Sequence, residues 1–287
     1  MVSRMPVFVL AAVSWLAPAR AQGQDAAGAV ATPVVLELFT SLGCSSCPPA
    51  EELLSRLGQD AEMGPTVIPL AYHVDYWDRL GWRDPFSNAA WTARQEGYAR
   101  ALKVDNGPYT PQLVVNGEAQ VNGTDGRRIL GSIEAARRRP PPAAVTVSAR
   151  LEGAGKPALA IEASVEMLQE VEAGKLELRV ALFENGLVTD VKGGENGGRK
   201  LATDFVVRRL ETAFSIEPVK GARRAAQLRM GLDRGWKTGN VGVAAFLQDP
   251  RSMRILAAAT VMRPAAAAAD QASAPSRVTT STSPRQP

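Results

Sequence analysis

Two cysteines separated by two serines, Cys44 and Cys47, constrain this chain more than any other feature. The segment 34–39 before them is apolar with a single acid, a pattern typical of a strand buried on both faces. After them, Pro48 and the acids and leucines that follow predict a helix closed by Gly58. The pair therefore lies where a buried strand passes into a helix.

This position favours redox chemistry. A spacing of three at a helix start puts both sulfurs on one side, close enough to form a disulfide. The N-terminus of the helix favours a thiolate at Cys44, lowering its pKa from about 8.5. Cys44, at the exposed start, is the predicted nucleophile, and Cys47 is the resolving thiol. Glu51 and Glu52 oppose the thiolate, but we expect both to be solvated and screened.

Other uses of the pair are open to different degrees. Zinc requires four ligands, and the chain has only two cysteines and one histidine. A purely structural disulfide remains an alternative, although closing a two-residue loop would constrain the unfolded chain little. Thiolates and one histidine also suit Cu(I), but no Met-rich or His-rich tract supports copper handling. The sequence indicates no cofactor.

The rest of the first half predicts an α/β domain. A strand–helix–strand crossover gives a parallel sheet, and ligand chemistry in such sheets collects at the carboxyl ends of the strands. Cys44, His73 and Asp75 should therefore converge. The remaining predicted elements are a strand over 66–74, a helix over 87–103, short strands over 111–115 and 119–121 joined by Asn116-Gly117, and a helix from Thr124 or Asp125 to Arg137.

Several side chains after the second strand are candidates for the site. His73 is the only histidine, and it is either a structural residue or a cation that favours the Cys44 thiolate. Asp75, Tyr76, Trp77 and Trp82 could line a peptide groove, or could form a satellite core under a long loop. The sequence leaves both questions open.

The second half predicts a small β-sandwich-like domain over 143–263, beyond a stiff Arg- and Pro-rich break at 137–142. The glycine-rich segment 193–198 lacks the Lys-Ser/Thr end of a phosphate loop and is interpreted as a mobile β-loop. The tail, 264–287, has the composition of a disordered segment. The predicted strands cover 145–151, 158–167, 176–185, 203–214, 225–232, 241–248 and 255–262.

The N-terminus predicts export. Residues 1–21 have a basic start, a short apolar run and a small-residue cleavage motif before Gln22, as in a secretory signal peptide. Without Arg4 and Arg20, 33 basic residues become 31 against 29 acidic ones, a net charge of +2. This balance predicts neither a nucleic acid nor an anionic membrane as partner. We expect a periplasmic or secreted protein without a membrane span in its mature form.

The motif Gly43–Pro49 and the later Tyr109-Thr110-Pro111-Gln112 resemble the thioredoxin superfamily. The resemblance implies a thioredoxin-like domain over 33–139, with Pro111 in the cis form facing the cysteines and the Thr110 backbone free to pair with a peptide. It also makes Glu37 the counterpart of the buried proton acceptor, although Glu37 lies one residue further from the pair. The Ser-Ser pair replaces Gly-Pro, so the reducing potential of thioredoxin does not transfer.

Longer phrases are similar to a family of secreted bacterial thioredoxin-like proteins catalogued as a domain of unknown function. The resemblance covers about 33–262 and implies a fold and a compartment, but no substrate. The predicted function is a periplasmic thiol–disulfide oxidoreductase whose partners are protein or small-molecule thiols and disulfides. The alternative is a binding or scaffold protein with an inert disulfide. The phrases are 35–41, 72–78, Gly81-Trp82, 109–112, 194–197 and 206–208.

Overall fold

The computed structural model describes residues 33–153 and 156–266 of the 287-residue chain. The predicted signal peptide, 1–21, lies outside these residues, as does most of the predicted disordered tail, 264–287. The prediction was wrong for the start of that tail, because Ala265 N–H donates to the Ala149 carbonyl at 3.1 Å and the Ala265 carbonyl accepts from Leu151 N–H at 2.9 Å. Among the helices described, none has the length and apolar character needed to cross a membrane.

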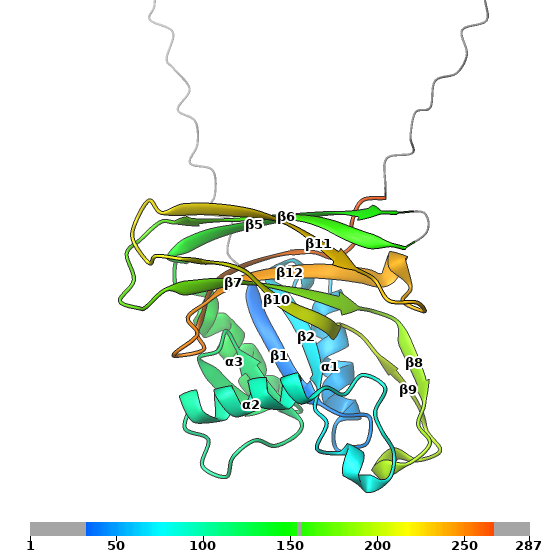
Figure 1. The fold of residues 1–287 in the computed structure, drawn as a ribbon. Coiled ribbons are helices and arrows are strands. Elements are labelled where there is room, and N and C mark those ends of the chain that lie inside the picture. Colours follow the sequence, from blue (N-terminus) through cyan, green and yellow to red (C-terminus); the bar gives the residue numbers. More distant parts are fainter. Residues whose placement is uncertain (1–32, 154–155, 267–287) are drawn as a thin grey trace, which may run out of the picture. The chain divides into compact units, whose positions relative to one another are not determined.

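One mixed sheet of eight strands runs through both halves of the chain (Figure 1). Its strands are β1 (Val34–Thr40), β2 (Val67–His73), β3 (Gln112–Val115), β4 (Ala119–Asn122), β7 (Leu176–Glu184), β10 (Val206–Ile216), β12 (Val241–Gln248) and β13 (Ile255–Val261). They follow the order β13-β12-β7-β10-β2-β1-β3-β4. The predicted parallel pair is confirmed: β1 and β2 run parallel, with Thr40 beside His73.

Helices cover both faces of the thioredoxin-like part of this sheet. They are α1 (Pro48–Gln59), α2 (Ala89–Ala101) and α3 (Gly126–Arg137), and Asp125 caps the last of them. Leu36 and Leu38 of β1 pack with α1 and α3, whereas Val35 and Phe39 pack with α2. Side chains alternate along a strand, so even positions of β1 face α1 and odd positions face α2.

The second half adds a separate antiparallel sheet of β5 (Ala143–Glu152), β6 (Ala158–Met167) and β11 (Arg223–Gly231), in the order β11-β6-β5. This sheet packs over β7, β10 and β12 through a shared apolar core, as the upper layer of Figure 1 shows. The predicted fold class, a thioredoxin-like α/β part followed by a small all-β part, is confirmed. The sequence did not reveal that the two parts share a sheet, joined where the Ala71 N–H donates to the Phe205 carbonyl at 2.8 Å.

Two local predictions were wrong. The strand expected over 203–214 is interrupted because Phe205 has a left-handed φ of 57°. The chain before it instead forms a hairpin of β8 (Leu187–Asp190) and β9 (Lys200–Thr203). Gly58 does not close α1 but lies within it, where a Cβ would come within 2.5 Å of Phe205 Cζ. This glycine is a packing requirement rather than a helix end.

Candidate functional site: the Cys44–Cys47 centre

The two cysteines lie between β1 and α1 and form a disulfide, with Cα atoms 5.5 Å apart. Turn hydrogen bonds shape the loop: Cys44 N–H donates to the Ser41 carbonyl, and Cys47 N–H donates to the Cys44 carbonyl. Both cysteines are completely buried, at 0% exposure, whereas Ser45 and Ser46 are exposed. The prediction of an exposed Cys44 was therefore wrong, because neighbouring side chains cover the sulfur.

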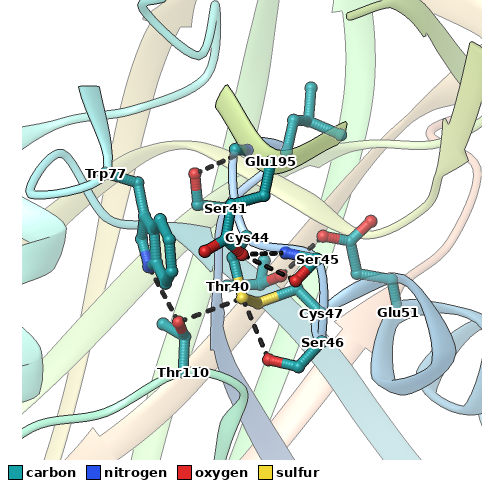
Figure 2. Close-up of a disulfide and its surroundings, with 12 residues drawn as sticks. Thr40, Ser41, Cys44, Ser45, Ser46, Cys47, Glu51, Trp77, Thr110 and Glu195 are labelled. Carbon is teal, nitrogen blue, oxygen red and sulfur yellow. Dashed lines mark hydrogen bonds between the residues drawn. A yellow bond between two sulfur atoms is a disulfide. The ribbon is translucent and has the colours of Figure 1, made fainter. Parts of the chain in front are cut away.

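Hydroxyl groups, rather than helix N–H groups, contact Cys44 Sγ. The first two residues of α1 are Pro48 and Pro49, which have no N–H to offer a thiolate. Instead Ser46 Oγ lies 3.3 Å and Thr110 Oγ1 lies 3.4 Å from Cys44 Sγ (Figure 2). The Trp77 indole N–H donates to Thr110 Oγ1 at 2.8 Å, which leaves the Thr110 proton free to point at the sulfur.

Pro111 follows this threonine, and the Thr110–Pro111 peptide bond is cis, as the resemblance implied. The Pro111 carbonyl accepts from Gly123 N–H at 2.9 Å, which fixes the proline at the start of β3. The sequence indicated a role only for the backbone of Thr110. Its side chain is the part that contacts the cysteine.

A buried polar cluster lies on the α1 face of the sheet, behind the cysteine loop. Thr40 Oγ1 donates to Glu51 Oε1 at 2.5 Å, and His73 Nδ1 pairs with Asp84 Oδ2 at 2.8 Å. Asp84 also accepts the Leu42 N–H at 2.7 Å, and thereby ties the cluster to the loop. Glu51 was expected to be solvated and is instead 5% exposed, because α1 turns it toward Thr40; Glu52 is exposed, as expected.

The cluster shifts the pKa values of its members. Burial raises the pKa of Glu51 above its usual range, although His73 and Thr40 oppose the shift. Burial alone would lower the pKa of His73, but Asp84 and then Glu51 raise it above 6.5. Burial likewise works against ionised Asp84, yet His73 and the loop N–H groups keep its pKa below the usual value. Among the described residues, His73 Nε2 is a buried atom without a hydrogen-bond partner.

Glu37 lies on the opposite face of β1, in the α2 layer. Its carboxylate accepts from Arg94 Nε at 2.7 Å and from Arg94 Nη2 at 3.0 Å, and it also accepts from Tyr98 OH. Gln248 extends this network by contacting both Arg94 and Tyr98. The structure thus places Glu37 in a buried ion pair and does not bring it to the cysteine loop.

The residues that follow β2 do not all lie at the disulfide. Asp75 turns toward α2, where it accepts from Thr92 Oγ1 at 2.6 Å, so it does not join Cys44 and His73. Tyr76 likewise bonds to Gln95 on α2. Trp77 lies at the disulfide, whereas Trp82 packs against the apolar cluster of Leu42, Val191 and Leu201. One tryptophan therefore belongs to the site and the other to a satellite core.

The glycine-rich loop between β8 and β9 closes the site from the second half. Glu195 accepts from Ser45 (Figure 2). Asn196 donates to the carbonyls of Leu42 and Cys44. A free mobile loop was expected, but this one is docked. Neither Asp84, Glu195 nor Asn196 was identified as a site residue from the sequence. For the last two, the matching phrase 194–197 was the available signal.

Over the described residues, no cluster of three or more His, Cys, Asp and Glu side chains is arranged to hold a metal ion. The polar groups that contact Cys44 Sγ are the hydroxyls of Ser46 and Thr110. The carboxylates behind the loop are engaged with Thr40 and His73, and Glu195 is engaged with Ser45. The arrangement suits chemistry at sulfur.

Comparisons with known proteins place the chain in a family. A family model described as "Protein of unknown function (DUF1223)" matches residues 35–248, and the chain belongs to this family. Among solved structures, protein AGR_C_4864 from Agrobacterium tumefaciens is 32% identical, with a TM-score of 0.61 over 81% of this chain and 95% of that one. HBP35 of Porphyromonas gingivalis shares the fold at 16% identity, with a TM-score of 0.60 over 87% of this chain and 82% of that one. No curated protein matches the chain.

Proposed function

We propose that this DUF1223 protein is a periplasmic thiol–disulfide oxidoreductase that acts through Cys44 and Cys47. The observation that supports it best is the contact of Thr110 Oγ1 with Cys44 Sγ, made next to cis-Pro111 in a thioredoxin-like fold. A hydroxyl that can donate to a sulfur favours its thiolate, and the thiolate is the species that attacks disulfides. The predicted signal peptide supports the compartment.

In the proposed reaction, the Cys44 thiolate attacks one sulfur of a substrate disulfide. A mixed disulfide forms, and the other substrate sulfur leaves as a thiolate. Cys47 then attacks Cys44 Sγ, so the Cys44–Cys47 disulfide forms and the substrate departs with both sulfurs reduced. In the reverse direction, a substrate dithiol attacks the Cys44–Cys47 disulfide and is itself oxidised. The reduction potential of the pair decides which direction prevails.

A second candidate has an observation of its own. Both cysteines are completely buried in the disulfide form, which also suits an inert, structural bond in a binding or scaffold protein. Attack by an external thiol would then require the covering loop to move. The two functions differ in whether a partner can be trapped.

The matched variants Cys47→Ala and Cys44→Ala separate them. Exchange predicts that Cys47→Ala traps mixed disulfides through Cys44, seen as thiol-reversible bands on non-reducing gels, and that Cys44→Ala traps few. Because the loop closed by the disulfide contains only two residues, both variants should retain most of the stability. Absence of trapped partners in both variants, with unfolding of the reduced wild type, would favour the scaffold function.

A further inference from the structure

The loop between β8 and β9 reaches the cysteine loop through its backbone and through a buried amide. Glu195 N–H donates to the Gly43 carbonyl at 3.1 Å. Asn196 is 1% exposed, and its Nδ2 donates to the Leu42 carbonyl at 3.0 Å and to the Cys44 carbonyl at 2.8 Å. Three carbonyls of the segment 42–44 are thus satisfied by residues about 150 positions later.

The carboxylate of Glu195 adds a charge to these contacts. Its Oε2 accepts from the Ser45 backbone N–H at 2.9 Å and from Ser45 Oγ at 2.6 Å. Figure 2 shows it reaching into the loop beside the disulfide. These hydrogen bonds lower the pKa of Glu195, so it is an anion at neutral pH. The Ser45 backbone N–H, next to Cys44, is therefore hydrogen-bonded to a carboxylate.

The surroundings fix the loop in this place. Arg199 Nη1 donates to Asn196 Oδ1 at 2.6 Å, which orients the amide so that its nitrogen faces the two carbonyls. Gly194 has a φ of +66°, and a Cβ there would lie only 3.1 Å from Gly43 Cα. Two glycines therefore allow the backbones to approach closely. The contact is built from several independent features.

We propose that Glu195 and Asn196 are positioning residues of the Cys44–Cys47 centre. Asn196 holds the backbone that presents Cys44, and the Glu195 carboxylate disfavours the Cys44 thiolate, which shifts the pair toward its disulfide form. The proposal deepens the proposed function and rests on it for its biological meaning. It assigns to the second half of the chain a direct role in the redox site.

The direction of the expected effect on the Cys44 thiolate follows from the charges around the cysteine loop. Glu51 of α1, His73 of β2 and Asp84 face it from within the fold, and Glu195 faces it from the surface. His73 is paired with Asp84, and the Glu51 carboxyl accepts from Thr40 within the fold. The Glu195 carboxylate is hydrogen-bonded to Ser45, the residue directly after Cys44, so its charge acts on the cysteine loop itself. Removing its charge should stabilise the thiolate, and a stabilised reduced form makes the pair a stronger oxidant.

The first test is Glu195→Gln, which keeps an acceptor for Ser45 and removes the charge. In the reduced protein, alkylation rate against pH should show a lower pKa for Cys44, by about half a unit. The equilibrium with glutathione should move about threefold toward the dithiol, which is about 14 mV at 29.6 mV per tenfold. The difference in Cys44 pKa between Glu195→Gln and the wild type should become smaller at 1 M salt, because salt screens the exposed charge of Glu195. Glu62→Gln, at an exposed glutamate after α1, is the matched control.

The second test is Asn196→Asp, which has nearly the same shape but cannot donate to the carbonyls. We expect slower exchange of the reduced protein with a small aromatic disulfide, at equal thiolate fraction. If both variants match the wild type in Cys44 pKa, potential and exchange rate, and only melt at lower temperature, the loop is structural and the proposal is wrong. Failure of Cys47→Ala to trap partners would instead remove the proposed function, while leaving these shifts in place.

Discussion

Two buried polar clusters lie on opposite faces of β1, and they differ in how their charged groups are compensated. On the α2 face, Glu37 and Arg94 form a bidentate ion pair that Tyr98 and Gln248 complete. On the α1 face, burial raises the pKa of Glu51, and His73 Nε2 lacks a partner among the described residues. On the α2 face the charges of Glu37 and Arg94 compensate each other, although the buried Tyr72 hydroxyl on that face also lacks a partner among the described residues. The cluster on the α1 face contains groups with shifted pKa values, Glu51, His73 and Asp84, and it lies behind the disulfide.

The comparison predicts the largest effect on the α2 face. Arg94→Met should lower the free energy of unfolding by about 3–5 kcal/mol, because it leaves the Glu37 carboxylate buried without its counter-charge. Urea unfolding with the disulfide intact measures this. Arg128→Met, in an exposed pair with Asp125, is the control and should change stability by at most about 1 kcal/mol. The alkylation profile of Cys44 should be unaffected by either change.

A cost below about 1 kcal/mol for Arg94→Met would contradict the assignment of this ion pair to stability. A shift in the Cys44 profile would contradict the separation of the two clusters.

The α1 face should show a smaller effect that depends on pH. Asp84 and Glu51 raise the folded pKa of His73 above 6.5, against burial and Arg208. A raised folded pKa stabilises the protein below the unfolded value, and this contribution is lost as pH rises through the folded pKa. The pKa of Glu51 is also raised, by burial, so its contribution to stability is likewise lost as the pH rises, beginning at a lower pH than for His73. Wild-type stability should therefore fall as the pH rises from pH 6 to pH 9.

His73→Gln should remove the part of this fall that begins above pH 6.5, since the chain has no other histidine. Urea unfolding at several pH values in that range gives the two profiles. Parallel profiles for the variant and the wild type would show that His73 does not titrate in this window. In that case His73 would be only a packing residue.

The two clusters also show what could be predicted from the sequence. A continuous apolar run predicted β1, and the prolines, acids and leucines after the cysteines predicted α1, because these depend on local pattern. The sequence could not show which of the two acids, Glu37 or Glu51, lies behind the cysteine loop. That depends on the face of β1 on which each acid is buried: Glu37 meets Arg94 on the α2 face, and Glu51 meets Thr40 on the α1 face. The β8–β9 hairpin was missed because its strands are only four residues each, and because Phe205 breaks the longer strand that periodicity suggested.

The smallest expected change is at Thr110, where the two interpretations of the disulfide diverge. Trp77 donates to Thr110 Oγ1, so the hydroxyl proton is directed to Cys44 Sγ at 3.4 Å. Thr110→Val keeps the shape and removes this donor. In the reduced protein, the pKa of Cys44 should rise by about half a unit to one unit, because a hydrogen bond to the charged form is lost. Alkylation of Cys44 against pH, in a Cys47→Ala background, measures the shift.

Thr92→Val, at the hydroxyl that bonds Asp75 away from the disulfide, is the matched control and should leave this pKa unchanged. Loss of the Thr110 hydroxyl also leaves the Trp77 N–H without its acceptor, so a stability loss of about 1 kcal/mol is expected in both redox forms. A catalytic contact adds a difference between those forms: the reduced protein should lose more stability than the oxidised one, since only the thiolate accepts strongly. Equal losses in the two forms, with no change in the Cys44 pKa, would favour the scaffold function and an inert disulfide.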